Sequence, residues 1–168
     1  MNHNQLKTLV KYSMMIALTA CATMVISIPV PSTNGYFNLG DTIVFLSAIL
    51  LSKKGGFIAG GIGSALADVL LGFPFWAPFT FIIKGLQGFL AGYALQTSFG
   101  KKHSILALFP AAVWMIFGYT IVKAIFYGWA IALARIPFCM IQSGFGAVAA
   151  NMIEKALSKT NIVKKPVK

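Results

Sequence analysis

The chain has 168 residues, of which 58% are hydrophobic and only 10% are charged. Soluble domains carry about 25% charged residues and disordered chains have low hydrophobicity, so this composition excludes an ordinary soluble enzyme and an unstructured tail. The formal net charge of +11 would indicate nucleic-acid binding in a soluble protein. The long apolar runs described next indicate an integral membrane protein instead.

Six apolar runs follow one another and predict an all-α membrane protein, a six-transmembrane-helix bundle in a single domain, residues 1–168. A spanning helix needs about 20 residues, and the second and third runs are shorter, so we expect them to tilt or to merge into a hairpin. The expected helices are 6–28, 41–52, 55–72, 77–97, 105–127 and 129–156, followed by a basic cytoplasmic tail at 157–168.

The basic residues near the ends of these runs and between them predict the topology, because Lys and Arg favour the cytoplasmic side of a membrane. They all fall on one side if both termini are cytoplasmic, whereas the opposite loops, 29–40, 73–76 and the turn around 128, carry none. These residues are Lys7, Lys11, Lys53, Lys54, Lys101, Lys102, Lys155, Lys159, Lys164, Lys165 and Lys168. The positive charge therefore reflects membrane topology, and we expect no nucleic-acid partner.

Five ionisable residues lie inside the runs or at their ends: Asp41, Asp68, Lys84, Lys123 and Arg135. Each such group costs about 2.5–3.5 kcal/mol on insertion scales, so a functional role is the first hypothesis. All five fall in the outer half of the predicted bundle. This asymmetry favours a ligand pocket near the outer face over an ion pathway. Snorkelling of Lys123 and Arg135, with a structural pair between Asp68 and Lys84, is the alternative.

The outer loops add aromatic and amide groups to the same region. Asn38 and Asp41 offer hydrogen bonds, and Trp76 and Tyr119 offer aromatic faces, a combination that suits a small, flat, polar heterocycle. Gln142 lies deeper, on the sixth run. Aromatic residues also occur simply as a belt at the membrane surface, and this alternative stays open for each of them.

Small residues recur every four positions in several runs, a spacing that lets helices approach closely in lipid. Most are expected to pack inside the bundle, among them Gly56, Gly60, Gly88 and Gly92. On the first helix the same spacing is carried by Ser13, Ala17 and Cys21. A row of small residues on a terminal helix would allow a helix of a partner subunit to pack closely against it.

Motifs for catalysis are lacking in this sequence, which has no GxxxxGK[ST] phosphate loop, no HExxH and no Cys/His cluster. The two cysteines, Cys21 and Cys139, lie in apolar runs and are expected to be packing residues. We therefore expect neither a catalytic site nor a bound metal or cofactor, and active transport would need energy from elsewhere.

Two segments carry a resemblance to a known family: GYFNLGD at 35–41 and KKGGFIAGGIGSALADVLLGFPFWAPFTFIIKGLQGF at 53–89. With the helix number and the small residues of the first helix, they resemble the substrate-binding S components of energy-coupling factor (ECF) vitamin transporters. The resemblance covers nearly the whole chain. It is nearest to the subgroup assigned to hydroxymethylpyrimidine or pyridoxine, with riboflavin S components as more distant relatives.

The resemblance implies a multi-pass protein of a bacterial or archaeal plasma membrane that captures a vitamin outside, beneath the first loop. It implies two kinds of partner, a transmembrane coupling protein and a pair of cytoplasmic ATPases, which use the ATP. The implied docking positions are Ser13, Ala17 and Cys21, with Ala20 beside them. The expected ligand-binding residues are Asn38, Asp41, Trp76, Lys84, Tyr119 and Gln142, supported by Asp68, Lys123 and Arg135.

Other hypotheses remain at this stage. A riboflavin or other vitamin S component is the nearest of them. A stand-alone secondary transporter would favour an inverted repeat and ionisable groups near the midplane, and a structural subunit without a ligand would tolerate changes at Trp76 and Lys84. The cations in the outer half mildly favour an anionic or electron-rich ligand, but Asn38, Asp41 and Trp76 would serve an uncharged heterocycle equally well.

Overall fold

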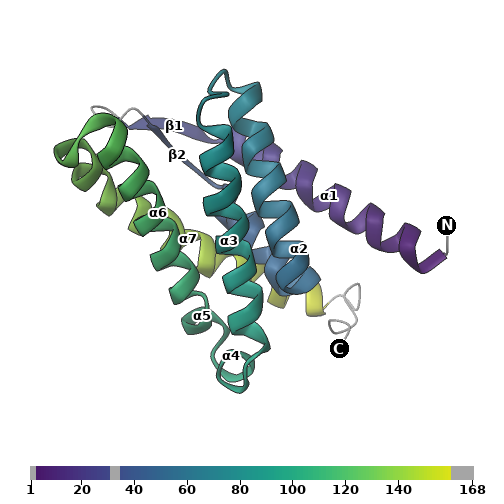
Figure 1. The fold of residues 1–168 in the computed structure, drawn as a ribbon. Coiled ribbons are helices and arrows are strands. Elements are labelled where there is room, and N and C mark those ends of the chain that lie inside the picture. Colours follow the sequence, from purple (N-terminus) through teal and green to yellow (C-terminus); the bar gives the residue numbers. More distant parts are fainter. Residues whose placement is uncertain (1–2, 31–34, 160–168) are drawn as a thin grey trace.

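The computed structural model describes residues 3–30 and 35–159. The elements in chain order are α1 (His3–Val25), β1 (Ser27–Val30), β2 (Gly35–Asn38), α2 (Gly40–Leu70), α3 (Ala77–Gln96), α4 (Ser98–Lys102), α5 (Ser104–Ala107), α6 (Phe109–Tyr127) and α7 (Trp129–Lys159). The long helices form a bundle with the β1–β2 hairpin at one end and α4 and α5 at the other, while the N-terminal part of α1 extends away from it (Figure 1). The predicted helical fold is confirmed.

Within the described residues, four helical stretches are long and apolar enough to cross a membrane: His3–Val25, Gly40–Leu70, Ser104–Tyr127 and Trp129–Lys159. The 20-residue helix α3 carries Lys84 and Gln87, which lower its hydropathy, and both side chains are buried. Long apolar helices with buried polar groups are typical of a membrane protein, in which polar side chains face the interior of the bundle.

Helix α2 reverses direction at Ser52, whose φ of 66° and ψ of −171° are not helical. A Cβ atom built on Gly60 would lie 3.0 Å from Cγ1 of Val44, although in a continuous helix these residues would be about 24 Å apart. The halves 40–51 and 53–70 are therefore antiparallel arms of a helical hairpin. The predicted runs 41–52 and 55–72 correspond to these two arms.

Glycines bring the arm 53–70 into backbone contact with α3. A Cβ atom built on Gly88 would overlap the carbonyl oxygen of Gly56, and one on Gly60 would lie 2.7 Å from the carbonyl oxygen of Lys84. Backbones approach this closely only where side chains are absent. The predicted internal packing of these glycines is confirmed, and the two contacts define the antiparallel register between the arm and α3.

The connection between α1 and α2 differs from the prediction of a helix to residue 28 followed by a loop. Helix α1 ends at Val25, and Ser27–Val30 pairs antiparallel with Gly35–Asn38, with Ser27 opposite Asn38 and Val30 opposite Gly35. Proline cannot continue a helix but is tolerated at the edge of a sheet. Pro29 therefore ends the helical part of the apolar run, and its β-branched neighbours Ile28 and Val30 continue it as a strand.

The remaining boundaries move by a few residues. The predicted fourth helix ends at Gln96 and is followed by the short α4, and the predicted fifth is divided at Leu108 into α5 and α6, with Pro110 in the first turn of α6. Helix α7 runs to Lys159, three residues into the predicted tail.

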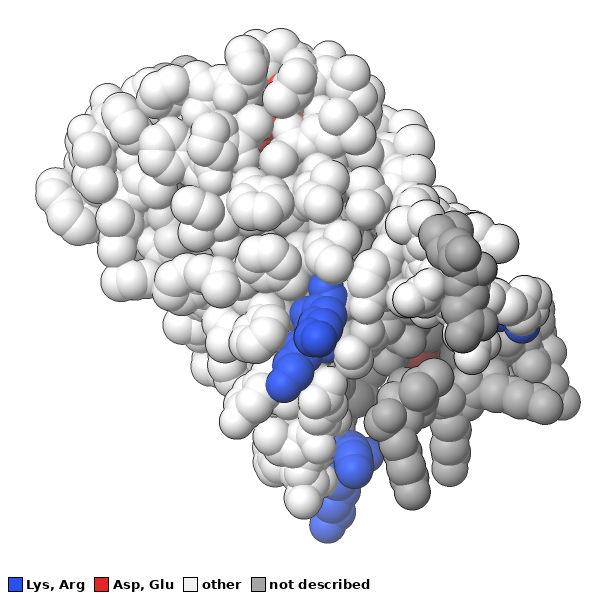
Figure 2. All heavy atoms as spheres, turned by 45° about the vertical axis from the view of Figure 1, so that its right-hand side comes forward, with Lys and Arg blue, Asp and Glu red and all other residues white. Residues whose placement is uncertain are grey.

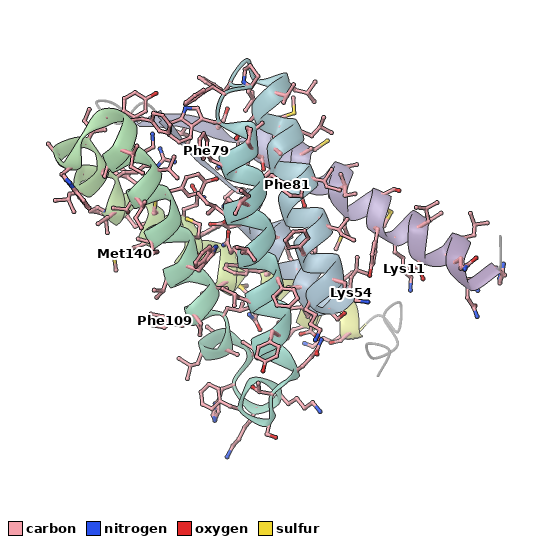
Figure 3. The ribbon with its side chains drawn as sticks, in the orientation of Figure 1. Lys11, Lys54, Phe79, Phe81, Phe109 and Met140 are labelled. Atoms are coloured by element: carbon pink, nitrogen blue, oxygen red, sulfur yellow. The ribbon has the colours of Figure 1, made fainter. Side chains whose placement is uncertain are left out.

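Cationic side chains gather toward one end of the molecule. On the face drawn in Figure 2 they lie in its lower part, and the upper part shows no Lys or Arg atoms and only small patches of acidic atoms. Figure 3 places Lys54 at the lower end of α2 and Phe79 near the opposite end of α3. The turn of the α2 hairpin and the β1–β2 hairpin thus lie at opposite ends, which is the asymmetry that the sequence predicts.

Candidate functional site

Asp41 is the centre of a buried polar network that joins three helices. Its carboxylate lies in the first turn of α2 and is 0% exposed. Its Oδ1 accepts a hydrogen bond from the ammonium group of Lys84 on α3. Gln87 donates Nε2–H to the same oxygen at 3.2 Å, and Gln142 of α7 donates Nε2–H to Oδ2 at 3.1 Å. Both carboxylate oxygens are therefore bound by side chains from neighbouring helices.

This network makes burial of the charges possible. Lys84 is 3% exposed, and an isolated ion in an apolar interior would cost several kcal/mol. The ammonium neutralises the carboxylate, the two amides fill further lone pairs, and the amino-terminal end of α2 adds a favourable dipole. The two groups can therefore be buried together, each beside a partner of opposite charge.

Gln142 also connects the network to the β1–β2 hairpin. Its Oε1 accepts from the backbone N–H of Asn38 at 3.2 Å, and Oδ1 of Asn38 accepts from the backbone N–H of Gly40 at 2.8 Å. A Cβ atom built on Gly40 would lie 2.8 Å from that Oδ1. The last residue of β2 is thus held against the buried carboxylate through one amide side chain.

Tyr119 of α6 lies beside the ion pair. Its ring centroid is 5.8 Å from Nζ of Lys84 and 5.9 Å from Cζ of Arg135, and its hydroxyl donates to Oγ1 of Thr80 at 3.3 Å. Cations at such distances are attracted to the negative face of an aromatic ring. Tyr119 therefore brings α3, α6 and α7 together around the same polar region.

A second cluster surrounds Lys123 of α6. Its Nζ lies 4.6 Å from the ring centroid of Trp76 and 5.2 Å from that of Tyr127, and these two rings stack with centroids 5.9 Å apart. Lys123 is only 3% exposed, which contradicts the alternative that it snorkels to water. Three phenylalanines, Phe75, Phe79 and Phe126, pack edge-on or tilted around Trp76.

Below Asp41, toward α4 and α5, an apolar layer crosses much of the bundle. Phe45 and Ala48 of α2, Ala91 of α3 and Leu108 beside α6 are at most 2% exposed and belong to one hydrophobic cluster. The cluster also includes Ala111, Ala147 and Ala150. Buried polar residues also occur at its level and beyond it, namely Ser47 on α2 and Asn151 on α7, which accepts from the Ser104 hydroxyl at 2.6 Å. The residues around Asp41 and Lys123 lie on the side of this layer that faces the β1–β2 hairpin.

Of the six residues expected to bind ligand, Asn38, Asp41, Lys84 and Gln142 share one hydrogen-bond network, and Tyr119 contacts it through Lys84. Trp76, which immediately precedes α3, is part of the second cluster, about two helical turns before Lys84. Arg135 reaches the first cluster and Lys123 the second. The structure thus brings the expected residues into two neighbouring clusters.

The expected pairing of Lys84 with Asp68 is wrong, because Lys84 donates to Asp41. The contacts Gly56–Gly88 and Gly60–Lys84 set the register between the arm 53–70 and α3. By this register Asp68 lies level with Trp76, two turns from Lys84. Asp68 is 4% exposed and lies on the same side of the apolar layer.

Sequence analysis missed Gln87, which is 0% exposed and contacts Asp41 directly. The sequence feature that could have identified Gln87 is its position one helical turn after Lys84, since residues three apart share a helix face. Thr80, one turn before Lys84, carries the same signal and contacts Tyr119.

On α1, the expected docking residues Ser13, Ala17 and Cys21 are exposed and lie on one face. Ala20 does not belong to this face, because it is 5% exposed. It lies next to Thr19, whose side chain would touch a Cβ atom built on Gly63, so this side of α1 packs on α2. The prediction for Ala20 is therefore wrong.

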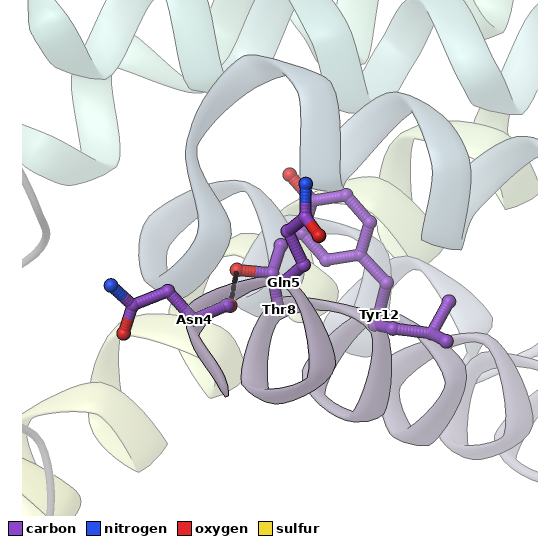
Figure 4. A pocket seen from close by; sticks show the side chains of 5 residues that line it. Asn4, Gln5, Thr8 and Tyr12 are labelled. Carbon is purple, nitrogen blue, oxygen red and sulfur yellow. Dashed lines mark hydrogen bonds between the residues drawn. The ribbon is translucent and has the colours of Figure 1, made fainter. Parts of the chain in front are cut away.

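A hollow of about 420 Å³ lies along the N-terminal part of α1. It is lined by Asn4, Gln5, Thr8, Leu9 and Tyr12, and the Thr8 hydroxyl donates to the carbonyl oxygen of Asn4 at 3.0 Å (Figure 4). None of the expected ligand-binding residues lines it. The hollow instead precedes the exposed small residues on the same helix.

Comparison with known proteins identifies the family. Residues 3–159 match the family model described as "ECF-type riboflavin transporter, S component". An uncharacterized protein of Pyrococcus woesei is 35% identical over 82% of this chain and 92% of its own length. The thiamine precursor transporter HmpT of Lactococcus lactis subsp. cremoris is 29% identical over 97% of this chain and 95% of its own length.

The fold has a counterpart among solved structures. A chain described under "Structure and mechanism of the S component of a bacterial ECF transporter" matches with a TM-score of 0.77 and 20% identity, covering 93% of this chain and 98% of that one. At this identity the likeness shows the fold alone, whereas the family match extends over nearly all the described residues. The chain therefore belongs to the S component family of ECF transporters and is a membrane transport subunit rather than an enzyme.

Proposed function

We propose that this S component captures a small heterocyclic vitamin or vitamin precursor from outside the cell and releases it inward when it is docked on an ATP-driven coupling module. The observation that carries this proposal is the buried network around Asp41, which lies beneath the β1–β2 hairpin and is separated from the other end of the bundle by an apolar layer. In this proposal the ligand reaches the network from the side of the β1–β2 hairpin.

The proposed topology is multi-pass in the plasma membrane, with six crossings formed by α1, the two arms of α2, α3, α6 and α7. Both termini are cytoplasmic in this arrangement. It is supported by the lysines at the α2 turn and at α4, which favour the cytoplasmic side. The β1–β2 hairpin then faces outward, above Asp41.

The proposed ligand is hydroxymethylpyrimidine or pyridoxine. The similarity to the thiamine precursor transporter over nearly the whole chain supports the pyrimidine. Aromatic faces at Trp76 and Tyr119, with hydrogen-bonding groups beside them, suit either ring. Riboflavin is the alternative ligand, supported by the description of the family model.

The ligand is identified by denaturing the protein purified in detergent and analysing the released small molecules by mass spectrometry. Calorimetric titration with hydroxymethylpyrimidine, pyridoxine and riboflavin follows. We expect one of them to bind at low micromolar affinity or better. If no small molecule is released and none of the three binds, the capture of these ligands is refuted.

Trp76→Ala is expected to weaken binding of that ligand at least about tenfold, or 1.4 kcal/mol, because it removes a half-buried aromatic face, the ring beside Lys123. Calorimetry on the purified variant measures the change. Phe109→Ala is the matched control, since Phe109 is 69% exposed at the opposite end of the bundle, and it should bind as the wild type does. If Trp76→Ala binds the ligand with the affinity of the wild type, Trp76 is not part of the ligand-binding site.

For docking, we propose that the exposed face of α1 with Ser13, Ala17 and Cys21 contacts the coupling protein. Ala17→Trp should abolish co-purification with the coupling protein and the two ATPases, because a large side chain prevents close helix approach. Ligand binding by the isolated subunit should be unchanged. Val113→Trp, at an exposed position of α6, is the control, and loss of assembly in both variants would argue against this surface.

A further inference from the structure

Two glutamine side chains donate hydrogen bonds to the Asp41 carboxylate, but their amide oxygens differ in whether they accept one. Each donates Nε2–H to one carboxylate oxygen, Gln142 to Oδ2 and Gln87 to Oδ1. The Gln142 oxygen is occupied, since it accepts from the backbone N–H of Asn38. Oε1 of Gln87 is completely buried and has no hydrogen-bond partner among the residues that the structure describes.

The orientation of the Gln87 amide follows from its neighbour. An amide oxygen facing the Asp41 carboxylate would repel it, so the NH₂ group must face Asp41 and Oε1 must point elsewhere. A buried carbonyl oxygen without a donor is costly, and nearly all such groups in folded proteins are paired. Gln87 therefore presents an acceptor that is suited to an incoming donor.

Two buried hydroxyls lie on the helices that meet at Asp41. Thr42 follows Asp41 on α2, and Ser143 lies on α7; neither Oγ1 of Thr42 nor Oγ of Ser143 has a partner within the described part of the chain. The two helices touch here, because a Cβ atom built on Gly146, one turn after Ser143, would lie 2.8 Å from Cβ of Asp41 and 3.1 Å from the nitrogen of Thr42. The helices that pack around Asp41, α2, α3 and α7, thus each carry a buried polar group without a partner in the described part of the chain.

This combination favours one kind of ligand group. Amide and carboxylate oxygens only accept hydrogen bonds, whereas the hydroxyls can donate or accept. An aromatic amino group offers two N–H donors and no competing acceptor, and a ring nitrogen beside it can accept from a hydroxyl. A ligand hydroxyl would instead bring one donor and a further acceptor to a site already rich in oxygen.

We propose that Gln87 determines specificity by accepting a hydrogen bond from an exocyclic amino group of the ligand, which makes an amino-substituted heterocycle the preferred substrate class. This inference rests on the proposed function, because it concerns the same site. It separates an aminopyrimidine from pyridoxine and adds a residue that the sequence analysis did not select.

The test combines one substitution with one change in the ligand. The probes are hydroxymethylpyrimidine and its analogue in which hydrogen replaces the exocyclic amino group. Calorimetry measures both with the wild type and with Gln87→Met, which keeps the side-chain length. We expect the wild type to lose at least about tenfold in affinity with the analogue. Gln87→Met should bind the two probes within about threefold of each other, because the partner of the amino group is gone.

Gln142→Met is the matched control, since its oxygen contacts the hairpin backbone. It should lower affinity for both probes by the same factor and keep the full preference for the amino compound. If the wild type discriminates and Gln87→Met discriminates equally, Gln87 acts only through Asp41 and the inference is wrong. If the wild type binds pyridoxine and not hydroxymethylpyrimidine, the amino class is wrong while the capture function stands. If the wild type binds no vitamin, both the proposed capture function and the inference about Gln87 are wrong.

Discussion

The Lys84→Met variant should unfold at a lower temperature than the wild type and should not bind the ligand. The substitution leaves the Asp41 carboxylate fully buried without its cation, and breaking a buried ion pair in this way costs about 3–5 kcal/mol. The amides of Gln87 and Gln142 still bind the carboxylate but do not neutralise it. The apparent midpoint of thermal unfolding in one detergent and a calorimetric titration measure the two effects.

A double variant separates the effect of losing the ion pair from the effect of leaving one buried charge without its partner. Asp41→Asn with Lys84→Met removes both charges and keeps the side-chain sizes, so most of the lost stability should return. If stability returns and ligand affinity stays at least about tenfold reduced, the ion pair also serves binding. A Lys84→Met protein as stable as the wild type would show that Asp41 is not held by Lys84.

Ionisable residues in apolar runs are the part of the site that sequence can predict. Their cost in a membrane makes each one stand out, and Asp41 and Lys84 could be selected without any knowledge of packing. Their pairing could not be selected, because it depends on the register between helices. The Gly56–Gly88 contact sets that register and places Asp68 two turns from Lys84.

Uncharged polar residues give a weaker signal. Gln87 carries no charge and lies in a run that is otherwise apolar, so its burial beside Asp41 is evident only from the structure. The same limit applies to Ala20, because an alanine fits an exposed docking stripe and a buried contact equally well. The packing of Thr19 on Gly63 and of Thr23 on Gly40 shows which side of α1 faces α2.

The helices are predicted more reliably than the connections between them. Long apolar runs indicate spans because each backbone group must be bonded within the lipid. The β1–β2 hairpin has only four residues in each strand, and Pro29 lies in the first of them, so in the sequence it is not distinguishable from a loop. The reversal at Ser52 is marked in the sequence by two lysines between two short runs, a pattern that favours a hairpin.

The second large effect is expected at Gly88 of α3. A Cβ atom there would overlap the backbone oxygen of Gly56, so Gly88→Ala must separate the arm 53–70 from α3. Overpacking costs about 1–3 kcal/mol, and a clash with backbone, which cannot change rotamer, should lie at the upper end of that range. The apparent unfolding midpoint is expected to fall markedly, as measured in the same detergent as the wild type.

Gly144→Ala is the matched control for this substitution. It makes the same chemical change within helix α7, but a Cβ atom at Gly144 meets no atom within 4 Å. Since alanine favours a helix over glycine by up to about 1 kcal/mol, this variant should be as stable as the wild type or slightly more so. If both substitutions left the midpoint unchanged, the arm and α3 would not be in backbone contact. Gly88→Ala should also weaken ligand binding, because moving α3 away displaces Lys84 and Gln87 from Asp41.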